Sequence, residues 1–231
     1  MKTVKSKITA SGNGLMTNLR ADVEICPNVS DKKEGIRFFI NGKMIEAKTS
    51  NVVSCEHCVV LANVEEGAGT KIALVEHFMA ACAICGIDNL DVYFKSQGYE
   101  IPIMDGSAKH WVELFNQTGY QGEQAAVKPV SNHFVFSHNN SMIVLMPNQG
   151  KTTITYAVNY NHPDLKNRWV NLDLDKNLDE IIEARTFGYL RDLETFQKMG
   201  YSKGVTIENT VGLTDDGGYT AALRSEFEPA K

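Results

Sequence analysis

The chain has 231 residues, of which 22% are charged, and a formal net charge of −5, which is the composition of an ordinary soluble globular protein. It contains no dense Lys/Arg patch that would neutralise phosphates, so nucleic acid is excluded as a partner. No apolar run reaches the roughly 20 residues that span a bilayer, and the N-terminus has no hydrophobic signal core, so we expect a cytoplasmic protein without stable membrane insertion.

The first third of the sequence predicts strands separated by turns. Residues 22–25 alternate between polar and apolar, and 36–40 is a mainly apolar run, so both are predicted strands. Asn41-Gly42 is a strong hairpin signal, and 11–14 predicts a turn or bulge. Further strands are expected over 8–10, 44–47, 59–61 and 90–94.

Two helices complete the first half. Apolar residues recur at helical spacing over 75–85, and Gly86 stands where a C-terminal cap belongs. Asp105 or Ser107 caps a second predicted helix, which Gly119 ends.

The polar stretch 121–129 predicts a linker, after which the same plan repeats. Strands are expected over 134–136, 142–145, 154–158, 169–174 and 210–213, and helices over 175–184 and 190–199. The segment Ser225-Glu226-Phe227-Glu228-Pro229 has the features of a helix N-terminus. We therefore expect the second half to lack its final helix.

Five cysteines without an export signal predict free thiols. Two C-x-x-C pairs, Cys55/Cys58 and Cys82/Cys85, are of a kind that can build a tetrahedral zinc site. Because the second pair falls on an apolar helix face, buried thiols are the favoured interpretation. A zinc-ribbon binding module is the alternative.

Glu76 and His77 place a carboxylate and an imidazole side by side near the start of an apolar helix. Charged groups are rarely buried unless they are paired or bound to a ligand. The pair is therefore either a chemical site or a solvated Glu beside a hydrogen-bonded core His. The two residues alone leave both interpretations open.

Four segments, in chain order, resemble one family. They are Ser11-Gly12-Asn13-Gly14-Leu15, Val75-Glu76-His77 with Gly86-Ile87-Asp88-Asn89, Glu100-Ile101-Pro102-Ile103-Met104-Asp105-Gly106-Ser107-Ala108, and Ala184-Arg185-Thr186-Phe187-Gly188. Together with the smaller match Tyr160-Asn161-His162-Pro163, they resemble the zinc-dependent UDP-3-O-acyl-N-acetylglucosamine deacetylases of lipid A biosynthesis. The resemblance covers essentially the whole chain.

The resemblance implies an α+β fold of two repeated domains, over 1–124 and 125–231. Each would be a sheet with two helices, and the helices would be sandwiched between the sheets. The second domain would carry a short βαβ-like insert at about 188–211 and lack its final helix.

The resemblance also implies an activity, the removal of an N-acetyl group from an acylated UDP-N-acetylglucosamine by a zinc-bound water and a carboxylate base. By motif, Glu76 would be the base, His77 a zinc ligand, and Thr186 a catalytic group that stabilises the tetrahedral intermediate. The substrate would contact Phe187, and its acyl chain would lie along Leu193, Phe196 and Met199. Taken without the resemblance, Thr186 simply ends a helix and the apolar residues of 190–199 pack in a core. The remaining histidines match no catalytic motif and are expected in surface or structural roles: His57, His110, His133, His138 and His162.

Some residues depart from the family pattern. Met16, Leu74 and Val205 replace residues that are usual there, and the family's other two zinc ligands would follow Glu228-Pro229-Ala230-Lys231. We therefore expect a C-terminally truncated sequence with weak zinc binding and no activity. It would be either a fragment of a zinc hydrolase, monomeric when intact, or a short inactive paralogue that binds a nucleotide sugar, an acyl chain or a partner protein. Uncovered sheet surface also predicts self-association.

Overall fold

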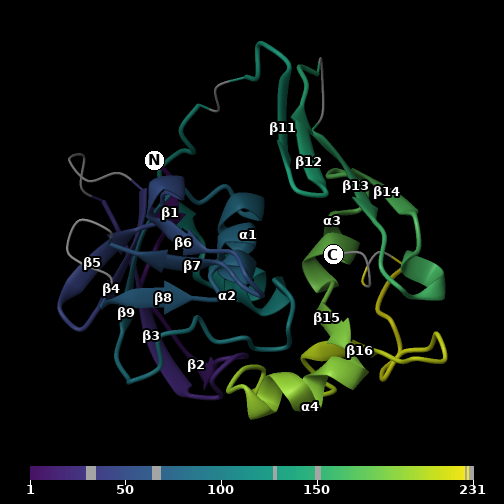
Figure 1. The fold of residues 1–231 in the computed structure, drawn as a ribbon. Coiled ribbons are helices and arrows are strands. Elements are labelled where there is room, and N and C mark those ends of the chain that lie inside the picture. Colours follow the sequence, from purple (N-terminus) through teal and green to yellow (C-terminus); the bar gives the residue numbers. More distant parts are fainter. Residues whose placement is uncertain (30–34, 64–68, 127–128, 149–151, 227, 229–231) are drawn as a thin grey trace.

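The computed structural model describes residues 1–29, 35–63, 69–126, 129–148, 152–226 and 228. Its mixture of sheets and helices confirms the expected α+β class (Figure 1). None of the helices in these ranges is long and apolar enough to cross a membrane.

A five-stranded sheet forms the centre of the first half, in the order β2-β3-β9-β4-β5. Its β4 and β9 are parallel, and the other neighbours are antiparallel. The strands are β2 Ile8–Asn13, β3 Arg20–Pro27, β4 Gly35–Ile40, β5 Lys43–Glu46 and β9 Asn89–Phe94. The turn predicted over 11–14 is wrong for its first three residues, because Ser11 to Asn13 continue β2 and pair with β3.

Two helices cover one face of this sheet, α1 Glu76–Ile84 and α2 Lys109–Thr118. The Phe78 ring lies 5.2 Å from the ring of Trp111, 5.7 Å from Phe115 and 6.0 Å from Phe38 of β4. All four side chains are fully buried. Gly119 ends α2 with φ +75°, as predicted, because a side chain would disfavour that conformation. This aromatic cluster is the centre of the main core.

Smaller elements close the first half. A three-stranded sheet contains β6 Val52–Ser54, β7 Val60–Ala62 and β8 Lys71–Ala73, and the short 3-10 helix η1 Thr49–Asn51 precedes it. The first residue of the predicted linker 121–129 belongs to a strand instead. Gln121 ends β10 Tyr120–Gln121, which pairs with the N-terminal β1 Thr3–Val4. The chain thus returns to its own N-terminus before it enters the second half.

The second half consists of strand pairs and short helices. One antiparallel hairpin consists of β11 Phe134–His138 and β12 Ser141–Leu145. A second consists of β13 Thr153–Val158 and β14 Arg168–Asp173, and the 3-10 helix η2 Pro163–Leu165 lies between these two strands in the chain. The parallel pair β15 Thr186–Tyr189 and β16 Thr210–Leu213 is connected through α4 Leu190–Lys198. The helix α3 Leu178–Glu183 is shorter than the predicted 175–184, because the Asp173 carbonyl accepts the N–H groups of Lys176 and Asn177 in a turn.

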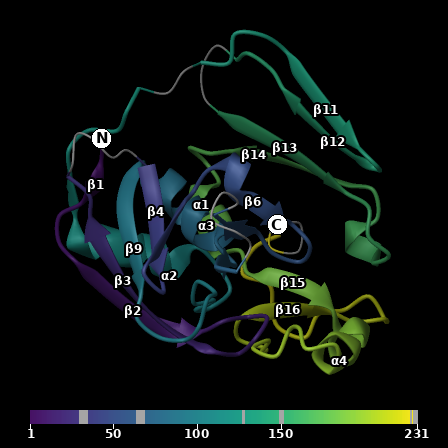
Figure 2. The ribbon, with the colours of Figure 1, turned by 60° about the vertical axis from the view of Figure 1, so that its left-hand side comes forward.

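In both views α1, α2 and α3 lie between the five-stranded sheet and β13–β14, α4 lies beside β15–β16, and β11–β12 stands at the outer edge of the molecule (Figures 1 and 2). The core of the second half is small, with Val158, Leu165, Val170 and Leu213 as its buried members. Of the predicted helix start over 225–229, Phe227 and Pro229 lie outside the described residues, and the Glu228 N–H donates to the Ser225 carbonyl at 3.3 Å. The two halves therefore differ strongly in how much apolar surface they bury.

Candidate functional site

The segment before α1 determines where Glu76 and His77 lie. The Ala73 N–H donates to the Tyr99 carbonyl, and the Ile101 N–H donates to the Ala73 carbonyl, so β8 is fixed against the motif 100–108. Leu74 is buried and has φ +60°, a costly conformation for a residue with a side chain. Glu76 and His77 then open α1 immediately after this bend.

Glu76 is half-buried, and its Oε2 accepts the Val59 N–H at 3.0 Å. An anionic side chain in the first turn of a helix also interacts favourably with the helix macrodipole. His77 is buried, with 6% of its surface exposed. Burial, and then the negative charge of Glu76, raise the pKa of the nearby Cys58 thiol to about 11. A protonated Cys58 therefore lies close to the Glu76 carboxylate at neutral pH.

The buried carboxylate of Glu100 holds the loop that follows β2. It accepts the N–H groups of Met16 at 2.7 Å and Thr17 at 2.8 Å, together with the Thr17 hydroxyl. A Cβ on Gly14 would lie 2.5 Å from the carboxyl carbon, so the close approach requires glycine. Glu100, from the most specific motif in the sequence, thus fixes the position of Leu15 and Met16.

The β15–α4–β16 unit docks on this loop. The Gly204 N–H donates to the Leu15 carbonyl at 2.9 Å, and the Lys203 N–H donates to the Met16 carbonyl at 3.0 Å. A Cβ on Gly204 would lie 2.1 Å from the Gly14 carbonyl oxygen. Backbone contacts therefore join the two halves here.

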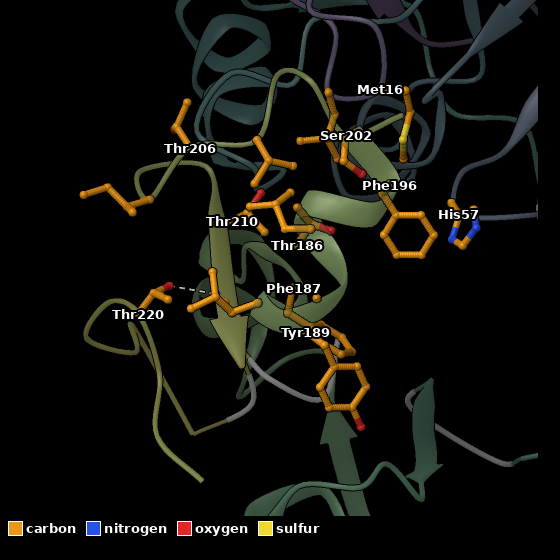
Figure 3. A pocket seen from close by; sticks show the side chains of 17 residues that line it. Met16, His57, Thr186, Phe187, Tyr189, Phe196, Ser202, Thr206, Thr210 and Thr220 are labelled. Carbon is orange, nitrogen blue, oxygen red and sulfur yellow. Dashed lines mark hydrogen bonds between the residues drawn. The ribbon is translucent and has the colours of Figure 1, made fainter. Parts of the chain in front are cut away.

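A pocket of about 350 Å³ lies at this junction (Figure 3). Small-molecule sites usually have volumes of about 300 to 1,000 Å³. Met16, His57 and Phe196 lie on one side of the view, and Phe187 and Tyr189 lie on another. Hydroxyl groups add polar positions to this mainly apolar lining: Thr186, Ser202, Thr206, Thr210 and Thr220. The pocket therefore suits an apolar ligand that also carries polar groups.

The structure brings Thr186, Phe187, Leu193 and Phe196 together in this pocket. Met199, predicted beside them, is 64% exposed and does not line it. Glu76 and His77 also lie outside its lining.

His57, expected in a surface or structural role, lines the pocket. Its ring lies 4.9 Å from that of Phe196. His57 has φ +63° and belongs to no periodic pattern, so only the folded structure reveals the contact.

Thr186 is tied to the first half through Gly106. The Thr186 N–H donates to the Gly106 carbonyl at 2.8 Å. Gly106 has φ +82°, and a Cβ there would lie 1.7 Å from the Asn209 carbonyl oxygen. The conformation and the close approach both require glycine.

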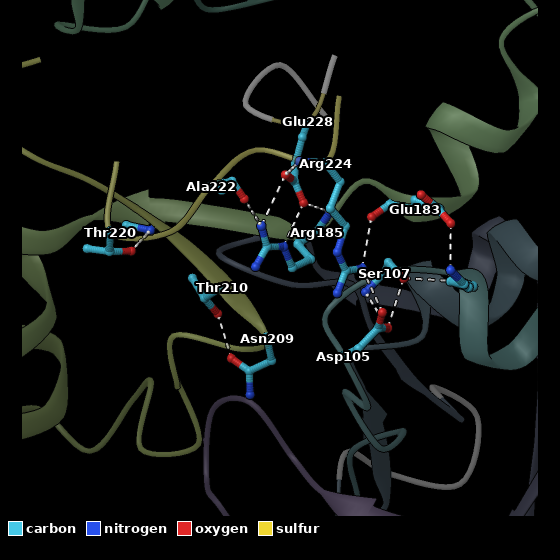
Figure 4. Close-up of polar contacts among 12 residues, drawn as sticks. Asp105, Ser107, Glu183, Arg185, Asn209, Thr210, Thr220, Ala222, Arg224 and Glu228 are labelled. Atoms are coloured by element: carbon cyan, nitrogen blue, oxygen red, sulfur yellow. Dashed lines mark hydrogen bonds and ion pairs between the residues drawn. The ribbon is translucent and has the colours of Figure 1, made fainter. Parts of the chain in front are cut away.

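Two ion pairs surround this tie (Figure 4). Glu228 accepts the Arg185 N–H at 3.0 Å and Arg185 Nε at 2.7 Å, and both side chains are buried. Arg224 Nη1 lies 2.7 Å from Asp105 Oδ2. Burial raises the pKa of Glu228 and of Asp105. The hydrogen bonds that each carboxylate accepts together outweigh burial, from Arg185 and Arg224 at Glu228 and from Arg224 and Ser107 at Asp105, so both pKa values lie below their ordinary values.

The described residues do not fit a zinc ion. Among them, no group of three or more His, Cys, Asp or Glu side chains is placed to hold a metal. The zinc-ribbon alternative is wrong, because Cys82 is buried on α1, Cys85 is buried at the C-cap of α1, and the four cysteines of the two pairs form no such group. Burial also raises the pKa of Cys82 well above its ordinary value.

Comparison of the sequence with known protein families identifies the same family that the motifs resemble. The chain belongs to the UDP-3-O-acyl N-acetylglycosamine deacetylase family, whose profile matches residues 1–231. Since deacetylases are hydrolases, the chain belongs to a family of hydrolases.

Three relatives are each named UDP-3-O-acyl-N-acetylglucosamine deacetylase. The chain is 29% identical to that of Leptospira biflexa, over 98% of this chain and 75% of the relative. It is 30% identical to that of Thermodesulfovibrio yellowstonii, over 98% and 77%. It is 31% identical to that of Geotalea uraniireducens, over 94% and 70%.

Proposed function

We propose that the substrate of this chain is UDP-3-O-acyl-N-acetylglucosamine, and that the family's reaction on it is removal of the N-acetyl group in lipid A synthesis. The pocket at the junction of the two halves carries this proposal. Its mainly apolar lining suits an acyl chain, and its hydroxyl groups suit the polar part of the same molecule.

Within this proposal Thr186, Phe187, Leu193 and Phe196 contact the substrate. The Thr186 hydroxyl, at the tied end of β15, donates to the oxygen that becomes negative when water attacks the acetyl carbonyl. Phe187 packs against the sugar, and Leu193 and Phe196 on α4 contact the acyl chain.

Glu76 is the proposed general base. A base must accept a proton from water, and a half-buried carboxylate can do so. His77 is the proposed first ligand of the family's zinc ion.

The described residues supply His77 without two further ligands in reach. We therefore propose that these 231 residues bind zinc weakly and release acetate too slowly to measure. The second candidate function follows from the same observation. It is a binding protein that holds the acylated sugar nucleotide without hydrolysing it.

Calorimetric titration with the acylated sugar nucleotide tests the pocket. We expect binding, and we expect Phe196→Asp to raise the Kd at least about tenfold, or about 1.4 kcal/mol. Met199→Asp is the matched control, because Met199 lies on the neighbouring turn outside the pocket, and its Kd should not change. Equal Kd values for both variants would contradict the proposed pocket.

Acetate release with and without zinc then tests the proposed inactivity. Binding without release agrees with that inactivity and with the binding protein. Zinc-dependent release that is lost in Glu76→Gln supports the hydrolase and contradicts the proposed inactivity.

A further inference from the structure

The segment between α4 and β16 forms one wall of the pocket and belongs to no helix or strand. It runs over residues 199–209. Val205, Thr206 and Ile207 of this segment line the pocket, and Thr206 and Ile207 are also exposed to solvent. Because such a segment has no ladder of backbone hydrogen bonds, its shape depends on the side chains that bond to it.

The side chain of Asn209 makes these bonds. Asn209 is buried, with 5% of its surface exposed. Its Oδ1 accepts the Thr206 N–H at 2.9 Å and the Thr210 hydroxyl at 2.8 Å (Figure 4). Its Nδ2 donates to the Gly204 carbonyl at 2.9 Å. One amide group therefore closes residues 204–210 into a single loop, called the 204–210 loop below.

The same loop makes two backbone contacts with the first half. At one end, the Gly204 N–H donates to the Leu15 carbonyl. At the other end, the Asn209 carbonyl lies so close to Gly106 that a Cβ there would be 1.7 Å from its oxygen. The Gly106 carbonyl in turn accepts the Thr186 N–H. Asn209 thus connects the Leu15 side of the pocket with the Thr186 side.

An apolar contact joins the loop to the segment before α1. Val205 packs against a small buried cluster of Leu15, Leu74 and Ile103. Leu74 stands two residues before Glu76 in the chain. This contact holds the loop against the first half, but apolar contacts are non-directional and do not determine the internal shape of a loop. The hydrogen bonds of the amide group do.

We propose that Asn209 is a positioning residue for the pocket. By holding the 204–210 loop, it places Thr206 and Thr210 for contact with the polar part of the acylated sugar nucleotide (Figure 3). The identity of that ligand rests on the proposed function, whereas the order of the loop does not. Asn209 is not part of the pocket lining, so it acts through the loop. A site that is already ordered binds more tightly, because the ligand does not have to offset the entropy of ordering it.

Hydrogen exchange of the chain without ligand tests the first part of the proposal. In Asn209→Ala we expect the protection factors of the Gly204 and Thr186 amides to fall at least about tenfold relative to that of Phe78. Asn89→Ala is the matched control. Asn89 on β9 is 1% exposed, and its side-chain amide is hydrogen-bonded to Asn28. A general loss of stability would lower all three protection factors together, as we expect for the control.

Calorimetric titration with the acylated sugar nucleotide tests the second part. Asn209→Ala should raise the Kd about tenfold, and Asn89→Ala should leave it unchanged. Urea midpoints verify that both variants are folded under these conditions. Asn209→Asp is the milder variant if Asn209→Ala does not fold. It keeps an acceptor for the Thr206 N–H and loses the donor to the Gly204 carbonyl, so protection should fall at Gly204 more than at Thr206, and the Kd should again rise.

Three results would overturn the proposal. They are unchanged protection of Gly204 and Thr186 in Asn209→Ala, lost protection with an unchanged Kd, and a Kd that rises equally in Asn89→Ala. If the parent chain does not bind the acylated sugar nucleotide, the proposed function fails instead. The exchange result then decides whether Asn209 holds the loop.

Discussion

The two halves contain similar elements, yet they bury very different amounts of apolar surface. In the first half, α1 and α2 cover one face of the five-stranded sheet, and Phe38, Phe78, Trp111 and Phe115 are fully buried. In the second half, Phe134 and Phe136 occupy equally regular strands and remain exposed. Strand formation thus depends on local pattern, whereas stability depends on a covering layer.

Substitution of one phenylalanine by alanine in each half should give the largest difference in the free energy of unfolding. Phe78→Ala removes the centre of the aromatic cluster and should lower the free energy of unfolding by about 3–5 kcal/mol. Phe136→Ala, the matched change in β11, should alter it by less than about 0.5 kcal/mol. Urea unfolding of both variants measures the contrast, and comparable losses would remove the distinction between the halves.

The ion pair between Arg185 and Glu228 is buried within the second half. Glu228→Ala leaves Arg185 buried without its carboxylate and should cost about 3 kcal/mol. Glu194→Ala breaks the exposed pair with Lys198 and should cause no measurable loss. Differential scanning calorimetry measures both changes. An unchanged transition in Glu228→Ala would show that the tie does not stabilise the fold.

Gly106 should contribute to the free energy of unfolding through two separable effects, its positive φ and its close approach to Asn209. Gly106→Ala adds strain at positive φ and contact with the Asn209 carbonyl, with an expected loss of about 1–3 kcal/mol. Gly42→Ala is the control, because Gly42 has φ +75° and a Cβ there meets nothing within 4 Å. The excess loss at Gly106 isolates the contact between the halves. If the two losses are equal, the close approach to Asn209 has no energetic weight.

Acid should weaken the junction before it weakens the aromatic core. The folded-state pKa values of Glu228 and Asp105 lie below their ordinary values of 4.5 and 3.8. Their stabilisation is present above those ordinary values and is lost as the pH falls through the lower folded values. The protection factor of the Thr186 amide should therefore fall below about pH 4, while that of the Phe78 amide remains high. Simultaneous loss of protection at both amides would contradict separate stabilities.

The smallest expected effect is a difference between the labelling rates of two cysteines. At pH 8 the exposed Cys55 should react with a thiol reagent well before Cys58, because the pKa of Cys58 is raised to about 11. Mass spectrometry of partially labelled protein gives the order. Equal rates would mean that Cys58 is less buried, and less close to Glu76, than in this structure.

Periodicity predicted the position of α1 and most strands, because their apolar residues face one buried layer. Periodicity failed where a single residue or turn determines where an element begins or ends. Gly12 pairs within β2, and the turn at Asp173 shortens α3. The motifs indicated Thr186 and Phe196, but His57 reaches the pocket through tertiary packing that leaves no local signal. Met199 continues the same helical spacing and points elsewhere, since spacing alone does not show where a pocket ends.

The docking of Gly204 on Leu15 also has a thermodynamic consequence. Both halves supply walls of the pocket, so a ligand that binds there prefers the docked arrangement to any state in which the halves separate. At a concentration one hundred times its Kd, such a ligand would stabilise that arrangement by about 2.7 kcal/mol. Occupancy of the pocket and attachment of the second half are then two measures of one equilibrium.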